Sequence, residues 1–327
     1  MEARGESRPH RGRCVSSPRH GGRAASAGPT LVSMRRHHFL LLAILLLANF
    51  SANAQEWAKT KLDASPRHRE YVTLKHGDRL LQDFVVYPEV SKKVPVVVLI
   101  HEIFGLSDWA KEMADELAAA GYIVVAPDLL SGMGPNGGNS DSFTSMDATT
   151  KAVSGLNGDQ VLADLDAAAD YAKKIPSSNG TFVTAGFCWG GGKSFAFATH
   201  RKDLAAAFVF YGPPPSEFST ITAPVYGFYA GNDARINATI SATTNAMKAA
   251  GKKYDPVTYD GAGHGFMRAA EDPANTNAAN KTARDQAFER LTSLLKSLPA
   301  AHASASPSRK TTAVNHGNPM LKSVPCH

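Results

Sequence analysis

Residues 186–191 (GFCWGG) place a nucleophilic side chain, Cys188, between glycines. The segment lies where a predicted strand turns sharply into a predicted helix, and glycines are needed there because the strand and the helix crowd the turn. The turn lifts the side chain clear of the sheet, to a helix N-terminus whose dipole and free N–H groups favour a thiolate. The spacing therefore predicts a nucleophilic Cys188; the alternative is a small buried cysteine in a tight turn.

Two later segments supply the partners that such a nucleophile needs. Asp233 lies in a Gly-Asn-Asp turn after the predicted strand 224–229, and His264 lies in residues 261–266 (GAGHGF), after the next strand. Nucleophile, acid and histidine in this order are typical of α/β-hydrolases. We expect His264 to act as general base toward Cys188, and Asp233 to fix the imidazole tautomer. Taken singly, the acid is equally compatible with a turn residue and the histidine with a loop residue.

Residues 101–105 (HEIFG) follow a buried β-branched strand, at the position from which α/β-hydrolases supply the second N–H group of an oxyanion hole. The predicted donors are the backbone N–H groups of Ile103 and Trp189, each worth about 3–4 kcal/mol toward a developing oxyanion. Glu102 would then lie close to Cys188, where charge repulsion keeps the thiol from ionising early. The alternative role for Glu102 is a cap on the next helix.

Ser194 and Ser107 are alternative nucleophiles. Ser194 stands six residues into the region after Cys188, where it should be buried in a helix, and Ser107 has no glycine-flanked turn. Neither has the geometry of a nucleophile elbow, so we expect neither to react. No metal site is predicted, because His37 and His38 fall in the N-terminal leader and no cluster of His, Cys and Asp has ligand spacing.

Predicted strands and helices alternate around these motifs. The predicted strands are 71–74 and 80–87, which form a hairpin, and then 94–100, 122–126, 181–187, 206–211, 224–229 and 255–259. The predicted helices are one capped by Asp108 that ends at Gly121, and then 159–174, 190–199 and 280–297. Buried strands alternating with helices predict an α/β-hydrolase fold, with a mostly parallel central sheet flanked by helices. Residues 131–158, rich in Gly, Ser, Asn and Asp, are expected to form a long loop bordering the site.

The charge of the chain argues against a nucleic-acid partner. The 327 residues include 35 Lys+Arg and 29 Asp+Glu, but residues 1–54 hold 8 of the cations and 2 of the acids, so the rest holds 27 of each. A body without a net positive field lacks the electrostatic footprint of a nucleic-acid-binding domain. The hydrophobic fraction of 43% is typical of a globular protein, and three Cys exclude a disulfide scaffold.

The N-terminal leader has the layout of a secretory signal peptide. In residues 34–54 a positive region is followed by the apolar run FLLLAILLLA and by Ala-Asn-Ala, which fits the small-x-small cleavage pattern. The apolar run is shorter than the ~20 residues of a membrane span. We therefore expect an exported protein, periplasmic or secreted, with no stable membrane anchor after signal cleavage.

Composition divides the remaining chain. Residues 1–33 show no periodicity and are interpreted as disordered or as an untranslated extension. One hydrolase-like domain is predicted over 62–299, and residues 300–327, which carry three positive charges and no acid, are interpreted as a disordered tail.

The motifs HEIFG, GFCWGG, GND and GAGHGF, in this order and with a strand that ends in APDL, resemble those of the dienelactone hydrolase family (carboxymethylenebutenolidases). The resemblance covers about residues 70–297, and a cysteine in the elbow together with HEIFG separates this family from most serine esterases. It implies a triad of Cys188, Asp233 and His264. It also implies that Glu102 holds the resting thiol protonated until substrate arrives. An enol-lactone would then open through a thioester acyl-enzyme that water hydrolyses, with no metal or organic cofactor.

The family's substrate-binding residues are matched less completely in this sequence than its catalytic residues. The family binds the substrate carboxylate with two arginines, and Arg268 occupies one of these positions, four residues after His264. A guanidinium fork suits a carboxylate, although a surface ion pair is an equal alternative. Residues 129–187, where the second is expected, contain no Arg, and Lys151 is no bidentate substitute. A small-molecule ester or lactone is therefore predicted, with a carboxylate left open and with Phe104 lining the pocket or simply packing.

Two other classes of function stay open. A fold alone does not prove catalysis, so a non-catalytic small-molecule-binding protein on the same scaffold is compatible with the motifs. A thiol redox sensor that pairs Cys188 with Cys326 is the other, and two free thiols on the purified protein would exclude it. The motifs together favour an exported carboxylic ester hydrolase of dienelactone hydrolase type.

Overall fold

A computed structural model describes residues 55–298 of the chain. The predicted extension 1–33 and signal segment 34–54 lie outside the described residues. The same holds for the predicted tail 300–327, with Cys326, and for the last residue of the predicted domain. The fold below is therefore that of residues 55–298.

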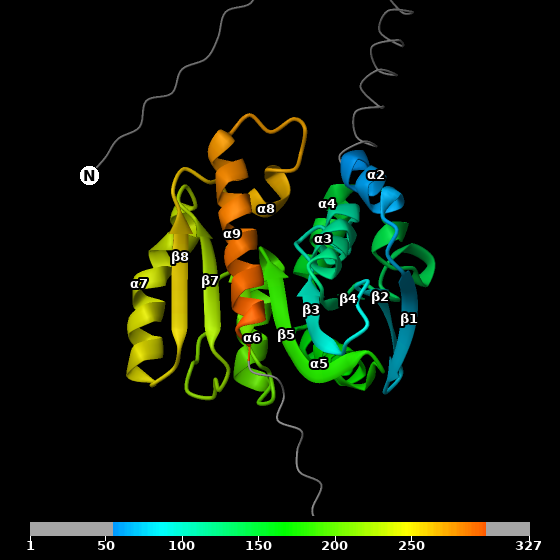
Figure 1. The fold of residues 1–327 in the computed structure, drawn as a ribbon, viewed down its shortest axis with the longest axis horizontal. Coiled ribbons are helices and arrows are strands. Elements are labelled where there is room, and N and C mark those ends of the chain that lie inside the picture. The colour runs from blue at the N-terminus through cyan, green and yellow to red at the C-terminus, as the bar shows by residue number, and fades with distance from the viewer. Residues whose placement is uncertain (1–54, 299–327) are drawn as a thin grey trace, which may run out of the picture. The chain divides into compact units, whose positions relative to one another are not determined.

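One eight-stranded sheet runs through the described part (Figure 1). Its strands are β1 (Arg69–His76), β2 (Arg79–Val86), β3 (Val94–Ile100), β4 (Ile123–Asp128), β5 (Ser178–Phe187), β6 (Ala207–Phe210), β7 (Val225–Ala230) and β8 (Tyr254–Tyr259). The spatial order is β1-β2-β4-β3-β5-β6-β7-β8. β2 pairs antiparallel with both β1 and β4, and every other neighbouring pair is parallel. The predicted mostly parallel sheet is confirmed.

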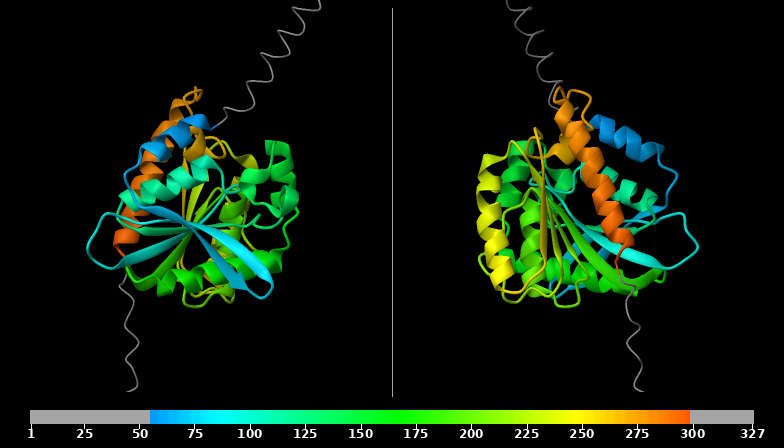
Figure 2. Two further views of the ribbon diagram at one scale, coloured as in Figure 1. Left: turned by 90° about the vertical axis from the view of Figure 1, so that its right-hand side faces the viewer. Right: turned by 60° about the vertical axis from the view of Figure 1, so that its left-hand side comes forward.

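Helices cover both faces of this sheet (Figure 2). On one face lie α2 (Glu56–Ala64), α3 (Asp108–Ala119), α8 (Phe266–Ala269) and α9 (Ala278–Lys296). On the other lie α5 (Gly158–Lys174), α6 (Trp189–His200) and α7 (Ala234–Ala249). Each face of the sheet packs against its helices in a separate apolar core: the first core lies under α2, α3, α8 and α9, and the second under α5, α6 and α7. Strand β3 contributes to both, because Val97 and Leu99 point into the first core whereas Val98 and Ile100 point into the second. Its sequence VPVVVLI is therefore apolar throughout.

The structure contains helices that the sequence pattern does not predict. α7 connects β7 to β8 and buries only Ile236, Thr243 and Met247, so its many polar and β-branched residues show little helical periodicity. A helix is nevertheless required there, because parallel neighbouring strands need a long crossover connection. α2 begins before residue 62, and it belongs to the fold because Ala58 and Leu62 are buried in the first core.

Two local expectations are corrected. The connection 131–158 is not loop throughout: it contains α4 (Met146–Ser154) and two short 3₁₀ turns, η1 (Pro135–Gly137) and η2 (Ser140–Ser142). The N-cap of α3 is Ser107 and not Asp108, because the Ser107 hydroxyl accepts a hydrogen bond from the Ala110 N–H at 3.4 Å.

The carboxyl ends of the parallel strands meet at one edge of the sheet, which is where open α/β sheets place their sites. Residues 101–105 follow β3, Cys188 follows β5, Asp233 follows β7 and His264 follows β8. Within residues 55–298, no helix combines the length and apolarity needed to cross a bilayer.

Candidate active site

Cys188 occupies a sharp turn between β5 and α6. Its backbone has φ 55° and ψ −115°, a conformation that is uncommon for a residue with a side chain and that marks a strained turn. The turn is possible because its neighbours are glycines: a Cβ on Gly186 would lie 2.0 Å from the Gly190 carbonyl oxygen, and a Cβ on Gly190 would lie 2.3 Å from that of Ile100. The predicted nucleophile elbow is therefore present as backbone geometry.

The three residues of the predicted triad form one chain of contacts. His264 Nε2 lies 3.1 Å from Cys188 Sγ, and His264 Nδ1 lies 2.5 Å from Asp233 Oδ2. Asp233 is buried, Cys188 is half-buried and His264 is exposed. An imidazole bound in this way presents one nitrogen to the thiol while the carboxylate fixes the other, which is the arrangement of a nucleophile, a base and an orienting acid.

Local contacts hold the acid and the histidine in these positions. Asp233 is the N-cap of α7, where its Oδ1 accepts from the Ile236 N–H at 3.3 Å, so one carboxylate both caps a helix and reaches the imidazole. The loop that carries His264 is fixed from α9, because Asn280 Oδ1 accepts from the Gly263 N–H at 2.8 Å.

The surroundings of the sulfur make the resting thiol reluctant to ionise. Burial raises the pKa of Cys188 to about 11, and the Glu102 carboxylate adds to the rise. Hydrogen bonds from the backbone N–H groups of Trp189 and Ile103 oppose this rise in pKa, as does the charge of Arg235. The helix N-terminus alone does not produce a thiolate here, because burial and the neighbouring carboxylate outweigh it. The two N–H groups are those predicted for the oxyanion hole, and both reach the sulfur.

Glu102 is 2% exposed and does not cap a helix. Its Oε2 accepts from Arg268 Nε at 2.8 Å, and its Oε1 accepts from the Tyr211 hydroxyl at 3.3 Å. Burial raises the pKa of Glu102, and the charge of Arg268 works against that rise. The carboxylate thus stays beside Cys188 through a buried ion pair.

Tyr211 is a site residue that the sequence motifs do not reveal. It follows β6, has a positive φ of 41°, is fully buried, and places its ring 5.1 Å from the His264 ring, edge to face. Its hydroxyl bonds Glu102, so it contacts both the base and the carboxylate beside the thiol. The sequence offers only the position after a buried strand as a signal, since the strain at this residue is visible only in the folded backbone.

The two predicted substrate-binding residues lie together, but the arginine is already engaged. Arg268 forms the ion pair with Glu102, and its guanidinium carbon lies 4.9 Å from the centroid of the Phe104 ring. A cation over a ring face is stabilised by the ring quadrupole. Phe104 therefore packs against the guanidinium that is paired with Glu102.

The alternative nucleophiles have structural roles. Ser194 is fully buried, and its hydroxyl lies 2.9 Å from that of Thr184 and 3.0 Å from the Phe208 carbonyl oxygen, to which it donates. Ser107 caps α3. The expectation that neither serine forms an elbow agrees with these contacts.

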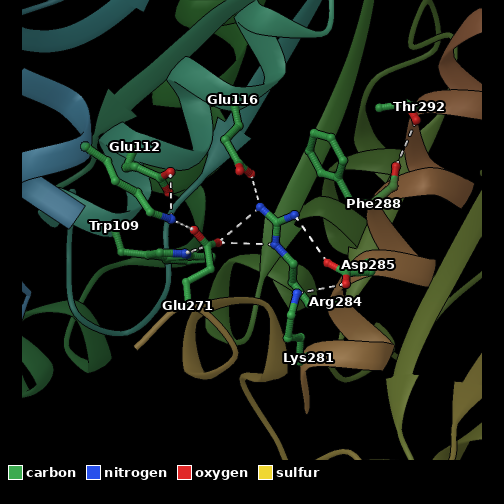
Figure 3. A network of polar contacts seen from close by, with 10 residues as sticks. Trp109, Glu112, Glu116, Glu271, Lys281, Arg284, Asp285, Phe288 and Thr292 are labelled. Carbon is green, nitrogen blue, oxygen red and sulfur yellow. Dashed lines mark hydrogen bonds and ion pairs between the residues drawn. The ribbon is translucent and has the colours of Figure 1, made fainter. Parts of the chain in front are cut away.

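A second cluster of carboxylates lies away from Cys188, between α2, α3 and α9 (Figure 3). We call Lys61, Glu112, Glu116, Glu271 and Arg284 the acidic network. Oxygens of its three glutamates lie within 4.8 Å of one another, close enough to share a cation. The network already contains two: Lys61 Nζ lies 2.7 Å from Glu271 Oε2, and Arg284 contacts Glu116 and Glu271. The sequence does not predict this cluster, since Glu271 joins it only through tertiary structure.

The fold and the site together define an α/β-hydrolase. The sheet has the strand order given above, a glycine-flanked cysteine lies in the turn from β5 to α6, an acid follows β7 and a histidine follows β8. Comparison with known proteins narrows the class. The sequence model of the dienelactone hydrolase family matches residues 81–298. The chain belongs to the dienelactone hydrolase family and is a hydrolase that acts on esters or lactones.

Individual relatives agree with this assignment. A protein of Salmonella typhi named "Putative carboxymethylenebutenolidase" is 32% identical over 186 residues, which are 53% of this chain and 68% of that protein. One of the same name from Saccharolobus solfataricus is 30% identical over 252 residues, 66% of this chain and 93% of that protein. The crystal structure of a "Putative Dienelactone Hydrolase" from Klebsiella pneumoniae matches with a TM-score of 0.62 at 24% identity, over 71% of this chain and all of that one. At 24% identity this structural similarity supports the fold alone.

Proposed function

We propose that this hydrolase is exported and cleaves an ester or an enol-lactone through a thioester on Cys188. The main support for this proposal is the chain of contacts from Asp233 through His264 to Cys188. Asp233 Oδ2 lies 2.5 Å from His264 Nδ1, and His264 Nε2 lies 3.1 Å from Cys188 Sγ. Two backbone N–H groups reach the same sulfur, which supports an adjacent oxyanion hole.

Acylation follows from this arrangement. Cys188 Sγ attacks the carbonyl carbon while His264 Nε2 takes the thiol proton, and the Ile103 and Trp189 N–H groups bind the oxyanion. Collapse of the tetrahedral intermediate breaks the carbon–oxygen bond of the ester, and the imidazolium returns the proton to the leaving oxygen. Asp233 stabilises the imidazolium between these two steps.

Deacylation reverses the roles. A water molecule attacks the thioester carbonyl while His264 takes its proton, and the Cys188 sulfur leaves and is reprotonated. An enol leaving group makes the first step easier, because an enolate is a weaker base than an alkoxide. That preference, with the family assignment, favours an activated ester or an enol-lactone as substrate.

Glu102 controls when the thiolate forms. Burial and the Glu102 carboxylate raise the pKa of Cys188 to about 11, so the resting thiol stays protonated at neutral pH. Movement of the carboxylate away from the sulfur when substrate arrives would remove that repulsion. The enzyme would thereby avoid alkylation or oxidation of an idle thiolate.

The test compares purified wild type with Cys188→Ala and Cys188→Ser on a dienelactone and on a neutral nitrophenyl ester. We expect wild type to hydrolyse at least one of them, Cys188→Ala to lose that activity, and mass spectrometry to detect an acyl group on Cys188. If Cys188→Ala is as active as wild type, the thioester mechanism is wrong. If the wild type binds a dienelactone without turnover, the protein is a binding protein on this scaffold.

Export is tested separately. The support is the signal-like segment 34–54, and α2 begins at Glu56, so cleavage after Ala54 would leave every described helix and strand intact. We expect N-terminal sequencing of protein recovered from the periplasm or the medium to start at Gln55. A native protein found only inside the cell, with an uncleaved leader, would contradict export.

A further inference from the structure

One carboxylate oxygen of the acidic network has no partner. Glu112 Oε2 is buried and forms no hydrogen bond with any residue of the described range, and the Glu112 side chain is 5% exposed. The other oxygen, Oε1, lies 3.7 Å from Lys61 Nζ, which is beyond hydrogen-bond distance. Figure 3 shows the carboxyl group of Glu112 directed toward Glu271, into the network. A buried carboxylate oxygen without a partner is costly, so this position favours a cation that satisfies it.

The three glutamates of the network come from two segments and can reach one ion. Glu112 and Glu116 are four residues apart on α3 and therefore share a face of that helix. Glu271 comes from the segment after α8, and one oxygen of each glutamate lies within 4.8 Å of the others. Two oxygens bound to the same Ca²⁺ are at most about 4.6–5.2 Å apart, twice the usual Ca²⁺–oxygen distance. The three carboxylates therefore fit around a single Ca²⁺.

The two cations of the network differ in how easily they can leave it. Arg284 contacts both Glu116 and Glu271, and its side chain is only 15% exposed. Lys61 reaches Glu271 from α2 with a side chain that is 50% exposed. A lysine side chain of this exposure can turn its ammonium into water while the stem stays on the surface. The Lys61 side of the network is therefore open to an ion and to the water molecules that complete its coordination.

Charge and donor type select the kind of ion. Counted as carboxylates, the three acids exceed the two cations of the network by one charge. A divalent cation in the place of the Lys61 ammonium, with Arg284 kept, brings the count to zero. The donors are all carboxylate oxygens, which suit hard cations, whereas Zn²⁺ and Cu²⁺ prefer nitrogen or sulfur ligands. Mg²⁺ demands a near-ideal octahedron and keeps most of its own water, so Ca²⁺ is the better match.

We propose that Glu112, Glu116 and Glu271 bind one Ca²⁺, which displaces the ammonium of Lys61 into solvent. The bound ion ties α3 to the segment that connects α8 to α9, and it stabilises the folded state as the calcium concentration rises. The site is structural and lies away from Cys188, so the proposal does not depend on the chemistry of the thiol.

The first test titrates purified wild-type protein, freed of metal with EDTA, with CaCl₂ in a calorimeter. We expect one Ca²⁺ per chain with a Kd of about 10⁻⁴–10⁻³ M, the range of extracellular calcium modules, and a Tm that rises with calcium. Glu112→Gln and Glu271→Gln should bind Ca²⁺ about tenfold or more weakly, because each removes a charged ligand. Glu289→Gln, at an exposed acid on α9, is the control and should bind as wild type does.

A lysine variant gives a result that a purely structural ion-pair cluster would not produce. Lys61→Ala removes the group that competes with the ion, so Ca²⁺ should bind about fivefold more tightly than in wild type, the size of one exposed ion pair. Lys59→Ala is the matched control. Lys59 has the same exposure on the same helix but pairs with Asp63, so its loss should leave the affinity for Ca²⁺ unchanged.

Tb³⁺ locates the ion, because it occupies oxygen sites that bind Ca²⁺ and luminesces when a nearby tryptophan is excited. Trp109 Nε1 donates to Glu271 Oε1 at 3.4 Å, and the centroid of the Trp57 ring lies 5.3 Å from Lys61 Nζ. Tb³⁺ at the proposed position should therefore give tryptophan-sensitised emission that CaCl₂ suppresses by competition. Glu112→Gln and Glu271→Gln should lose most of this emission.

Several outcomes would contradict the calcium site. Calcium binding or Tb³⁺ emission that persists unchanged in both glutamine variants would place the ion elsewhere. Neither binding heat nor a shift in Tm at calcium concentrations tenfold above the expected Kd would exclude the site. Weaker binding in Lys61→Ala would overturn the displacement of Lys61, and equal affinity for Mg²⁺ would overturn the choice of Ca²⁺.

Discussion

The thiol site and the acidic network both bury glutamates against arginine, but with different numbers of charges. At the site one carboxylate, Glu102, faces one guanidinium, Arg268. In the acidic network three carboxylates share two cations, and Glu112 Oε2 is buried without a hydrogen-bond partner in the described range (Figure 3). The first arrangement is balanced and close to a reacting atom, whereas the second has a surplus acid and no contact with Cys188.

The difference shows how one kind of interaction serves two purposes. The acidic network joins α2, α3, the segment after α8, and α9, so its ion pairs hold helices together around the first core. The Glu102–Arg268 pair joins the loop after β3 to α8 and sets the charge beside the thiol. Changes in the network should therefore alter stability, and changes at the site should alter reactivity.

The largest expected effect is on catalysis. Asp233→Asn should lower kcat/KM by about 10³–10⁴-fold, because the imidazole loses both its orientation and the charge that stabilises the imidazolium. Stability should change little, since an asparagine at this N-cap can still accept from the Ile236 N–H. Steady-state kinetics and urea unfolding on the same sample check both parts. A loss of stability without a loss of kcat/KM would contradict the separation of the two regions.

The next effect is on stability. Arg284→Met should lower the free energy of unfolding by about 3 kcal/mol, because it leaves Glu116 and Glu271 short of a cation in a buried cluster. Activity per folded molecule should stay within twofold of wild type. Urea unfolding and active-site titration provide the measurements, with Arg284→Lys as the milder control. A fall in activity with unchanged stability would show that the network acts on the site.

A smaller effect is expected on the reactivity of the thiol. Glu102→Gln removes the carboxylate charge that raises the pKa of Cys188, so this pKa should fall by about one unit from its resting value. The rate of alkylation by iodoacetamide as a function of pH measures the shift. Glu217→Gln, at an exposed carboxylate, is the control and should leave the profile unchanged. An unchanged or raised pKa in Glu102→Gln would mean that Glu102 does not suppress the thiolate.

The last effect is a pH-dependent gain in stability. Burial, with Glu271 and Glu116 nearby, raises the pKa of Glu112 from 4.5 to about 9 in the folded protein. The folded state therefore holds a proton that the unfolded state releases, and stability falls as the pH rises from about 4.5 toward 9. Glu112→Gln cannot titrate, so its stability relative to wild type should increase as the pH is raised from 5 to 8. Urea unfolding at both pH values tests this, and a constant difference would contradict the raised pKa.

Much of the site could be predicted because its signals are local. The glycines around Cys188 indicate a tight turn, because a Cβ on Gly186 or Gly190 would clash with the neighbouring backbone. The segments that carry Asp233 and His264 each follow an apolar run that predicts a strand. Tyr211 and the acidic network carry no such signal. Their roles depend on which segments meet in space, and a tyrosine or an arginine in an undistinguished position has many possible partners.

The same distinction applies to the fold. Apolar β-branched runs determine β3 and β4 directly, because strands covered on both faces must be apolar throughout. α7 could not be predicted from periodicity, since it buries few side chains and forms because the parallel strands β7 and β8 require a crossover between them. The sequence by itself determined the elbow, the order of the reacting groups and the class of sheet. Only the tertiary structure decided that Glu102 pairs with Arg268, because ion pairing depends on distances between segments far apart in the chain.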